Sequence, residues 1–235
     1  AMARNLPVWT EVELAYLVSE APMVGITGSN GKTTTTTLVY EMLAQAHKKP
    51  LVAGNIGTVA CGVAQQATSE NIIVTELSSF QLMGVSQFKP KVAVLLNLYD
   101  AHLDYHGTFE AYAEAKFAVT KHQDSSDYFI YNADQAIVKR YAERSKAQLI
   151  PFTTKGRTAH GISADETKIY WQGDAIMERA QIALPGEHNL QNIVAAVATC
   201  LLLGCEVAPL QHVLQQFSGV KHRTQFVSNR QGVKW

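Results

Sequence analysis

The chain has few cysteines, no long apolar run and no excess of either charge. Its three cysteines, at positions 61, 200 and 205, form no Cys-x-x-Cys pair, which argues against a disulfide scaffold or a zinc ribbon and fits a reducing, cytoplasmic environment. No apolar stretch reaches transmembrane length, and no signal-peptide pattern opens the sequence. Because the net charge is zero, no broad field favours nucleic acid or an anionic membrane, and we expect neither partner.

What the chain does have is a sequence typical of a phosphate-binding loop. Residues 27–34, Thr-Gly-Ser-Asn-Gly-Lys-Thr-Thr, follow an apolar run that predicts a strand and precede a helical pattern at residues 35–46. Lys32 is expected to reach the β- and γ-phosphates of a nucleotide, and the Thr33 hydroxyl to bind Mg²⁺. The strict motif has glycine where Ile26 stands. The residues expected to bind the nucleotide are Gly28, Ser29, Asn30, Gly31, Lys32, Thr33 and Thr34.

Strand and helix patterns alternate over the first two thirds of the chain. Near-continuous apolar runs predict strands buried on both faces at residues 24–27, 72–75, 92–97 and 128–132, and helical patterns occur at residues 33–46, 108–121 and 134–144. This alternation predicts an α/β fold with a mostly parallel, doubly wound sheet. Ligands bind at the carboxyl ends of the strands in such a sheet, where the phosphate loop, Glu76 and Asn97 are expected to meet.

The pattern changes after residue 148. Short β-rich pieces at residues 149–153, 168–171 and 180–184 are separated by glycine and polar turns, which predicts a small antiparallel β appendage. Helices are expected again at residues 188–203, capped by Gly204, and at residues 208–217. Residues 225–235 read as part of a hairpin.

Several polar residues outside the loop could carry chemistry. Glu76 ends an apolar strand, where an acid of a phosphate-loop protein helps to hold Mg²⁺, although a surface glutamate would look the same. Residues 97–106 alternate histidines and carboxylates, a composition that suits a metal site and also a polar loop. The residue pattern around Lys116 predicts a solvated lysine on a helix. Asn189 and Asn192 share a helical face and could read an adenine edge, or one of them could cap the helix.

Four segments together resemble a known family. Besides residues 27–34, these are Glu-Leu-Ser-Ser-Phe-Gln-Leu at 76–82, Gly-Asn-Ile-Gly at 54–57 and Thr-Glu-Val-Glu-Leu at 10–14. The chain resembles the ATP-dependent Mur ligases of peptidoglycan synthesis, and segment 76–82 resembles in particular the members that add D-glutamate to UDP-N-acetylmuramoyl-L-alanine. Residues 1–22 then correspond to a short cloning remnant and the exit of a UDP-binding domain, 23–224 to the central ATP-binding domain, and 225–235 to the start of a third domain.

The resemblance implies roles for individual residues. Lys32, Lys116 and His102 would be catalytic, and the metal ligands for two Mg²⁺ ions would be Thr33, Glu76, His102 and Lys116, the last as a carbamate. Asn55 and Ser78 would contact the UDP-sugar substrate. Asn189 and Asn192 would contact adenine, and Arg223 the nucleotide. Where the family often has an acid before the metal-binding histidine, this chain has Ala101.

The implied reaction is amide bond formation through an acyl phosphate, with ATP converted to ADP. Positioning and charge neutralisation catalyse such phosphoryl transfer. We expect a monomer whose 235 residues alone do not complete the ligation. Two alternatives are a non-catalytic nucleotide-binding module and a P-loop GTPase. The GTPase is disfavoured because the chain has no Asn/Thr-Lys-x-Asp segment to read guanine.

Overall fold

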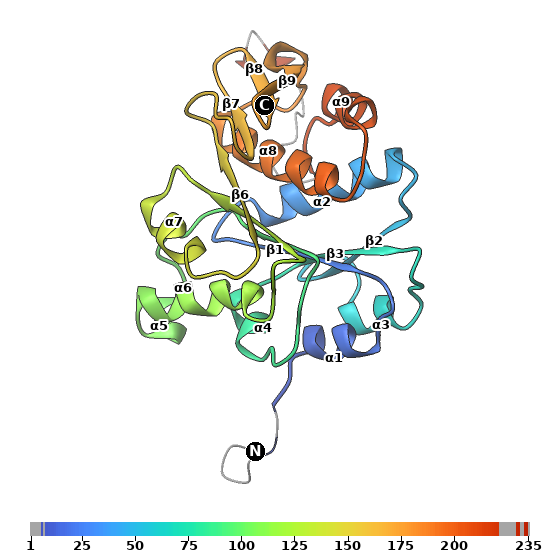
Figure 1. The fold of residues 1–235 in the computed structure, drawn as a ribbon, viewed down its shortest axis with the longest axis vertical. Helices are drawn as coiled ribbons and strands as arrows, with labels where there is room; N and C mark the ends of the chain where they lie inside the picture. Colours follow the sequence, from blue (N-terminus) through green and yellow to red (C-terminus); the bar gives the residue numbers. More distant parts are fainter. Residues whose placement is uncertain (1–5, 7, 221–228, 231–232, 235) are drawn as a thin grey trace.

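The computed structural model describes residues 6, 8–220, 229–230 and 233–234, and its main feature is one nine-stranded sheet (Figure 1). The strand order is β2-β3-β1-β4-β5-β6-β7-β8-β9. The strands are β1 Met23–Thr27, β2 Pro50–Gly54, β3 Ile72–Glu76, β4 Val92–Leu95, β5 Tyr128–Asn132, β6 Gln148–Thr153, β7 Ile162–Ala164, β8 Lys168–Trp171 and β9 Asp174–Glu178. A separate two-stranded sheet pairs β10 Asn229–Arg230 with β11 Val233–Lys234.

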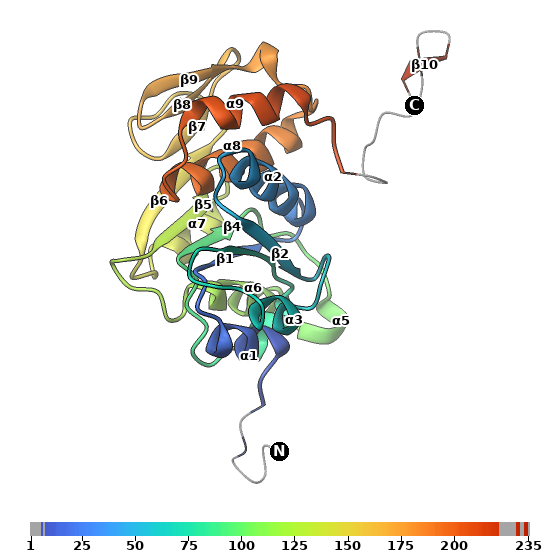
Figure 2. The same cartoon turned by 90° about the vertical axis from the view of Figure 1, so that its right-hand side faces the viewer.

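Helices cover both faces of the sheet (Figure 2). One layer contains α2 Lys32–Gln45, α8 Glu187–Leu202 and α9 Val207–Gln216. The opposite layer contains α1 Glu11–Val18, α3 Ala60–Ala64, α4 Ser79–Met83, α5 Leu103–His106, α6 Phe109–Phe117 and α7 Ala136–Ala142. Short 3₁₀ turns occupy Ala118–Thr120 and Arg179–Gln181. Among the described residues, no helix has the length and apolar character needed to span a bilayer.

The apolar strands are explained by burial on both faces. In β4, Val92 and Val94 belong to the core under α2 and α8, whereas Ala93 and Leu95 belong to the core under the other layer. Successive side chains of a strand point to opposite faces, so a strand covered on both sides must be apolar throughout. The prediction of a mostly parallel, doubly wound α/β sheet is confirmed, because β1 to β7 pair in parallel.

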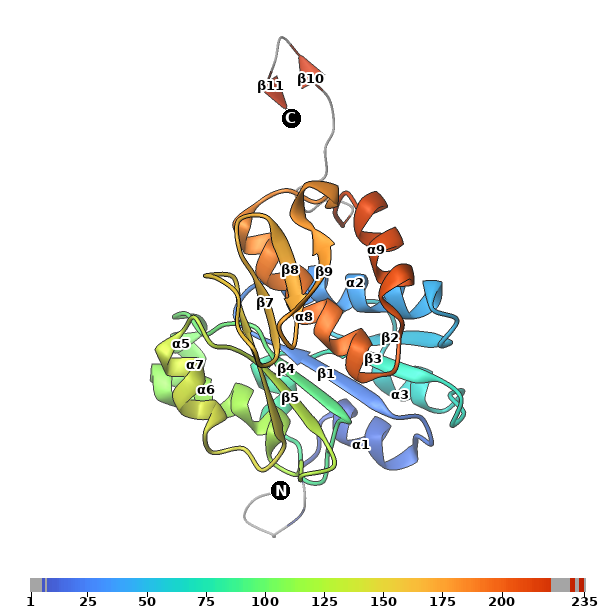
Figure 3. The ribbon, with the colours of Figure 1, turned by 45° about the horizontal axis from the view of Figure 1, so that its top comes forward.

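The predicted appendage is real but differs in detail. Strands β8 and β9 are antiparallel to their neighbours, yet they extend the main sheet and do not form a sheet of their own (Figure 3). β6 was expected in the appendage and instead pairs in parallel with β5 over five residue pairs. The expectation of a strand at residues 180–184 is wrong, because the third appendage strand is β9 and a 3₁₀ turn follows it.

The predicted helix end at Gly204 is confirmed. Gly204 has φ +76°, and the Cys205 N–H donates to the Cys200 carbonyl at 3.0 Å. This left-handed residue with a hydrogen bond back to the last turn is the common glycine-based C-terminal cap. Strand β2 was missed because most of its residues are only half-buried, as befits an edge strand, so its apolar signal is short.

Candidate functional site

The predicted site residues gather at the carboxyl edge of the sheet. β1 lies between β3 and β4, so the chain segments leaving these three strands meet at one point. This is where strand order reverses in an open α/β sheet, the usual position of a ligand site. The segment after β1 is the phosphate loop, the residue at the end of β3 is Glu76, and Asn97 follows β4.

Asn97 fixes the shape of the loop. Its side-chain oxygen accepts the Asn30 N–H at 2.8 Å, its amide donates to the Asn30 carbonyl at 3.1 Å, and its carbonyl accepts the Ser29 N–H at 3.0 Å. The Lys32 ammonium donates to the Gly28 and Ser29 carbonyls at 2.9 and 3.0 Å, so it lies against the loop that carries it.

Gly31 is required where the loop enters α2. Its φ is +85°, and a Cβ atom there would lie 2.1 Å from Asn192 Oδ1. No side chain caps the start of α2, so the helix N-terminus opens directly onto the space beside Asn192. A helix N-terminus without a side-chain cap is a favourable site for an anion.

Glu76 contacts two other predicted residues, buried Thr33 and exposed Asn55. The Thr33 hydroxyl donates to Glu76 Oε2 at 2.8 Å, and Asn55 Nδ2 donates to Glu76 Oε1 at 2.8 Å. Glu76 is 2% exposed, so the interpretation of a surface glutamate is wrong. A hydroxyl and a carboxylate beside a phosphate loop are oxygen ligands of the type that Mg²⁺ takes.

Lys116 is buried, which contradicts the expectation of a solvated lysine. Its side chain extends from α6, donates to Thr27 Oγ1 at 3.4 Å and lies 4.9 Å from the centre of the Tyr112 ring. Burial, with the nearby Lys32 charge, lowers the pKa of the Lys116 amine to about 7, and the Glu76 carboxylate offsets part of this shift. An amine with such a pKa is neutral in a large fraction of molecules at physiological pH.

His102 sits at the rim of the site. It precedes α5 in a left-handed conformation, φ +54°, and its ring centre is 5.2 Å from that of Phe80 and 6.3 Å from that of Tyr112. In the part of the chain that the structure describes, no three His, Cys, Asp or Glu side chains gather as a metal-ligand set. The histidines and carboxylates of residues 97–106 therefore do not form a set of three such ligands by themselves.

A cavity of about 390 Å³ joins the loop to α8. It brings together the predicted residues Asn30, Gly31, Thr34, Asn189 and Asn192, and Asn97, Tyr99, His188 and Gln191 complete its lining. The alternative that an asparagine caps α8 is wrong, because Gly186 holds that position and Asn189 lies inside the helix. Asn189 Nδ2 donates to the Pro185 carbonyl at 2.7 Å. Arg223 lies outside the described residues.

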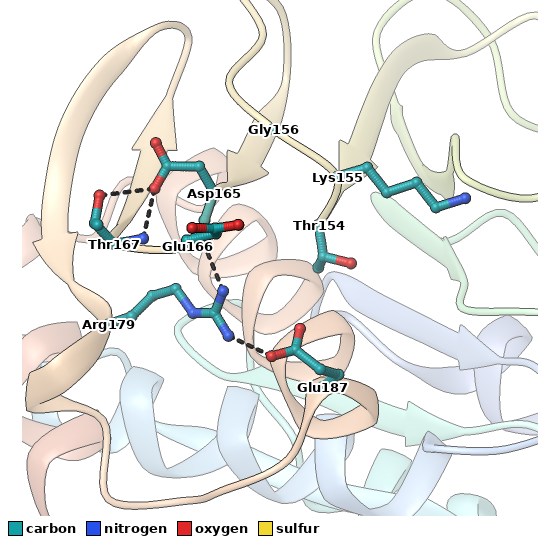
Figure 4. A pocket seen from close by; sticks show the side chains of 8 residues that line it. All are labelled: Thr154, Lys155, Gly156, Asp165, Glu166, Thr167, Arg179 and Glu187. Atoms are coloured by element: carbon teal, nitrogen blue, oxygen red, sulfur yellow. Dashed lines mark hydrogen bonds and ion pairs between the residues drawn. The ribbon is translucent and has the colours of Figure 1, made fainter.

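A larger cavity of about 600 Å³ lies beside the first turn of α8, between the segment after β6 and the β7–β8 turn. Arg179 crosses it and donates to the Asp165 carbonyl at 2.6 Å and to Glu187 Oε1 at 2.5 Å (Figure 4). The Asp165 carboxylate accepts the Thr167 N–H at 2.7 Å. Because these charged groups already have partners within the cavity wall, the cavity gives no indication of a specific ligand.

Two residues near the amine of Lys116, Thr27 and Tyr112, were given no role in the sequence analysis. Thr27 Oγ1 donates to the Leu77 carbonyl at 2.8 Å, and the Tyr112 hydroxyl is 2.9 Å from Ser29 Oγ. The spacing of four residues between Tyr112 and Lys116 puts both on one helical face, and this signal could have identified Tyr112. Ser78, by contrast, was predicted, and it caps α4 together with Gln81.

Comparison with known proteins gives consistent matches. The model of the Mur ligase middle domain matches residues 26–200. A UDP-N-acetylmuramoylalanine–D-glutamate ligase of Geobacillus sp. (strain WCH70) is 54% identical over 235 residues, 100% of this chain and 52% of the relative. A ligase of the same name from Bacillus cereus (strain B4264) is 51% identical over 97% of the chain and 51% of its own length. The chain thus spans about half the length of the curated relatives it matches.

Solved structures agree on the fold. The UDP-N-acetylmuramate:L-alanyl-gamma-D-glutamyl-meso-diaminopimelate ligase from Neisseria meningitides superposes with a TM-score of 0.72 at 20% identity, covering 94% of this chain and 74% of that one. A MurF ligase from Thermotoga maritima in complex with ADP gives 0.71 at 21% identity, covering 94% and 54%.

Proposed function

Because the chain belongs to the Mur ligase middle-domain family, we propose that it is the ATP-binding catalytic domain of a ligase that joins D-glutamate to UDP-N-acetylmuramoyl-L-alanine. The identity of about half of all residues to ligases of that name supports this substrate pair. The segment at residues 76–82, which resembles the D-glutamate-adding members, begins at the carboxyl end of β3, next to the end of β1 where the phosphate loop starts.

The observation that carries the proposal is the contact between Thr33 and Glu76. It places a hydroxyl from the start of α2 and a carboxylate from the end of β3 within 2.8 Å of each other, beside the phosphate loop. These oxygens fit the first Mg²⁺ ion of an ATP complex. Bound Mg²⁺ would neutralise charge on the terminal phosphates, while the α2 N-terminus and Lys32 orient the same groups. Asn189 and Asn192 would contact the adenine in the adjoining cavity.

In the proposed reaction, the carboxylate of the UDP-sugar substrate attacks the γ-phosphate and expels ADP. The amine of D-glutamate then attacks the acyl phosphate, loses a proton and displaces phosphate to leave an amide. Asn55 and Ser78 would hold the first substrate. Keeping the attacking oxygen in line with the leaving oxygen can lower the activation barrier by several kcal/mol, about 7–11 at most.

Lys116 would become a metal ligand as a carbamate. Its neutral amine can form a bond to the carbon of CO₂ and release a proton, and the burial that lowers its pKa to about 7 favours this neutral form. The product is an oxygen-bearing anion, which suits Mg²⁺ as a cationic ammonium does not. His102 would be the other protein ligand of the second ion. The close approach of Lys116 to Thr27 and Tyr112 supports this proposal, because it directs the amine into the cluster around the loop.

The test of nucleotide binding is calorimetry with ATP and GTP, with and without Mg²⁺. We expect ATP to bind and GTP to bind far more weakly, and Mg²⁺ to bind more tightly in the presence of an ATP analogue than without it. Tighter binding of GTP than of ATP would favour the GTPase alternative. Equal Mg²⁺ affinity with and without nucleotide would contradict the shared site of Thr33 and Glu76.

A second assay separates a catalytic domain from a nucleotide-binding module. We propose that the 235-residue chain hydrolyses ATP slowly at most and forms no amide product with both substrates, whereas a full-length protein containing it does. Product formation by the chain at a rate near that of the full-length protein would refute the division of the substrate sites among domains. A full-length protein that binds ATP and never forms product would favour the module.

A further inference from the structure

Glu11, the first residue of α1, connects the N-termini of two other helices. Its Oε1 accepts a hydrogen bond from Gln81 Nε2 of α4 at 2.9 Å, and its Oε2 accepts the backbone N–H of Ala60, the first residue of α3, at 3.0 Å. Gln81 lies 70 positions after Glu11 in the chain, and Ala60 lies 49 positions after it. None of the roles assigned above involves Glu11.

The contact with Gln81 determines how Ser78 is held. Gln81 Oε1 accepts both the Ser78 N–H at 2.9 Å and the Ser78 hydroxyl at 2.8 Å, and the Gln81 N–H donates to Ser78 Oγ at 3.3 Å. A glutamine amide has one oxygen and one nitrogen, so its oxygen can face Ser78 only if its nitrogen faces away. Glu11 provides the acceptor for that nitrogen and thereby fixes the amide in the orientation that Ser78 needs.

The contact with Ala60 anchors the segment that carries Asn55. Residues 55–59 connect β2 to α3 and include Asn55, whose side chain donates to Glu76. The Asn55 N–H also donates to the Glu76 carbonyl at 2.9 Å. Ala60 is the point where this connection enters α3, and its N–H has the Glu11 carboxylate as acceptor. One carboxylate therefore holds the segment of Ser78 and the segment of Asn55.

The position of Glu11 is itself tightly determined. The hydroxyl of the preceding residue, Thr10, donates to the Gln81 carbonyl at 2.8 Å. A Cβ atom at Gly84 would lie 2.6 Å from Thr10 Cγ2 and 2.9 Å from the Thr10 nitrogen. The start of α1 thus lies directly against the end of α4, and no side chain could be inserted between them.

We propose that Glu11 is a positioning residue for the UDP-sugar substrate, acting through Gln81 on Ser78 and through Ala60 on the segment of Asn55. The inference rests on the proposed substrate-binding roles of Ser78 and Asn55. Glu11 does not touch the substrate in this scheme. Its carboxylate sets the separation and orientation of the two groups that do.

The test exchanges the hydrogen-bonding partners. Glu11→Gln places an amide nitrogen, a donor, against another donor, either the Ala60 N–H or Gln81 Nε2. Gln81→Glu places its carboxylate against that of Glu11. Each single change therefore leaves one hydrogen bond of the network without a donor–acceptor pair. The double variant Glu11→Gln/Gln81→Glu restores every donor–acceptor pair: Gln at 11 donates to the new carboxylate and accepts from Ala60, while the carboxylate at 81 still accepts from Ser78. Glutamate is also favoured at this position of a capping box.

In the full-length ligase, each single variant should raise the KM for the UDP-sugar substrate about tenfold or more. The reason is that loss of one charge-assisted hydrogen bond changes an equilibrium constant by a factor of that size. The KM for ATP should stay within about twofold, since the phosphate loop and α8 are held by other contacts. The double variant should restore the KM for the UDP-sugar substrate to within about twofold of the wild type.

Glu13→Gln is the matched control. It changes the same residue type on the same helix, and its carboxylate contacts residues 86–88, none of which is assigned to the site. It should lower stability without moving the KM for the UDP-sugar substrate, which separates positioning from general destabilisation. An unchanged KM in Glu11→Gln, a double variant no better than the single ones, or an equal rise of KM in Glu13→Gln would overturn the proposal.

Hydrogen exchange keeps the test independent of the proposed reaction. In the chain itself, exchange of the Ser78 and Ala60 amides should quicken about tenfold in Glu11→Gln and return toward the wild-type rate in the double variant. Unchanged exchange at both amides would refute the positioning network. If the full-length protein forms no amide product while exchange behaves as expected, the proposed function fails and the network stands.

Discussion

Glu13 gives the sharpest prediction about stability. Its carboxylate is fully buried and accepts three backbone N–H groups of the segment before β4: Ser86 at 2.8 Å and Phe88 at 3.0 Å on Oε2, and Gln87 at 2.7 Å on Oε1. Glu13→Gln keeps the shape and replaces one oxygen by an amide nitrogen. The remaining oxygen can serve the two donors now on Oε2, and the new nitrogen would then face the Gln87 N–H, donor against donor.

The expected loss follows from this mismatch. One charge-assisted hydrogen bond disappears, the other two lose their charge, and a backbone donor is left without an acceptor, which together cost about 2–4 kcal/mol. For a chain of this size, that corresponds to a fall in the unfolding temperature of about 4–16 °C. Urea unfolding should show a lower midpoint with an unchanged slope, since the extent of unfolding is the same.

Glu20→Gln is the control, because it makes the same chemical change on an exposed residue just after α1. It should change stability by no more than about 0.5 kcal/mol. A Glu13→Gln variant that unfolds at the wild-type urea concentration would show that the buried carboxylate does not hold residues 86–88 as the distances indicate.

Three further predictions concern the proposed nucleotide site. Lys32→Ala should abolish ATP binding measured by calorimetry while leaving the circular dichroism spectrum unchanged, and wild-type affinity would contradict the phosphate-loop assignment. Gly31→Ala should lower ATP affinity at least about tenfold, because the added Cβ would lie 2.1 Å from Asn192 Oδ1. Gly62→Ala is the control and should leave ATP affinity unchanged, because its Cβ would meet only Thr58 Cγ2, at 3.7 Å. Lys116 should make stability depend on pH, because its amine has a pKa of about 7 in the folded chain and 10.5 in the reference state. Between these values the unfolded chain binds one more proton at this amine than the folded chain does. The contribution of Lys116 to the free energy of unfolding should therefore rise by up to about 1.4 kcal/mol per pH unit from pH 7 to 10 and be flat below pH 7. Lys116→Met should remove that slope in urea titrations, and a slope equal in both proteins would show that the amine is not buried in its neutral form.

The sequence predicted best those features that depend on neighbours along the chain. The loop at residues 27–34 was identified because its glycines, its lysine and the flanking strand and helix are contiguous. Strands β1, β3, β4 and β5 were identified because burial on both faces requires an unbroken apolar run. The glycine cap after α8 is likewise local, since it needs only one residue with a positive φ.

The sequence predicted less well the direction of a strand and whether it lies at the edge of the sheet. β6 belongs to the parallel part of the sheet because its backbone pairs with that of β5. No property of residues 148–153 alone distinguishes a parallel partner from an antiparallel one. Edge strand β2 has few fully buried residues, so it lacks the apolar signal on which the prediction depends.

The tertiary structure alone decided which charged residues are buried. Lys116 looks like a solvated lysine in its own helix, and it is desolvated because Thr27, 89 positions earlier, and Tyr112 enclose its amine. Glu11 and Glu13 look like ordinary first-turn acids, and only the packing of α1 against α3, α4 and the segment before β4 turns them into acceptors for distant groups. Local sequence sets which groups a residue can offer, whereas desolvation and hydrogen-bond partners come from segments that meet only when the sheet has formed.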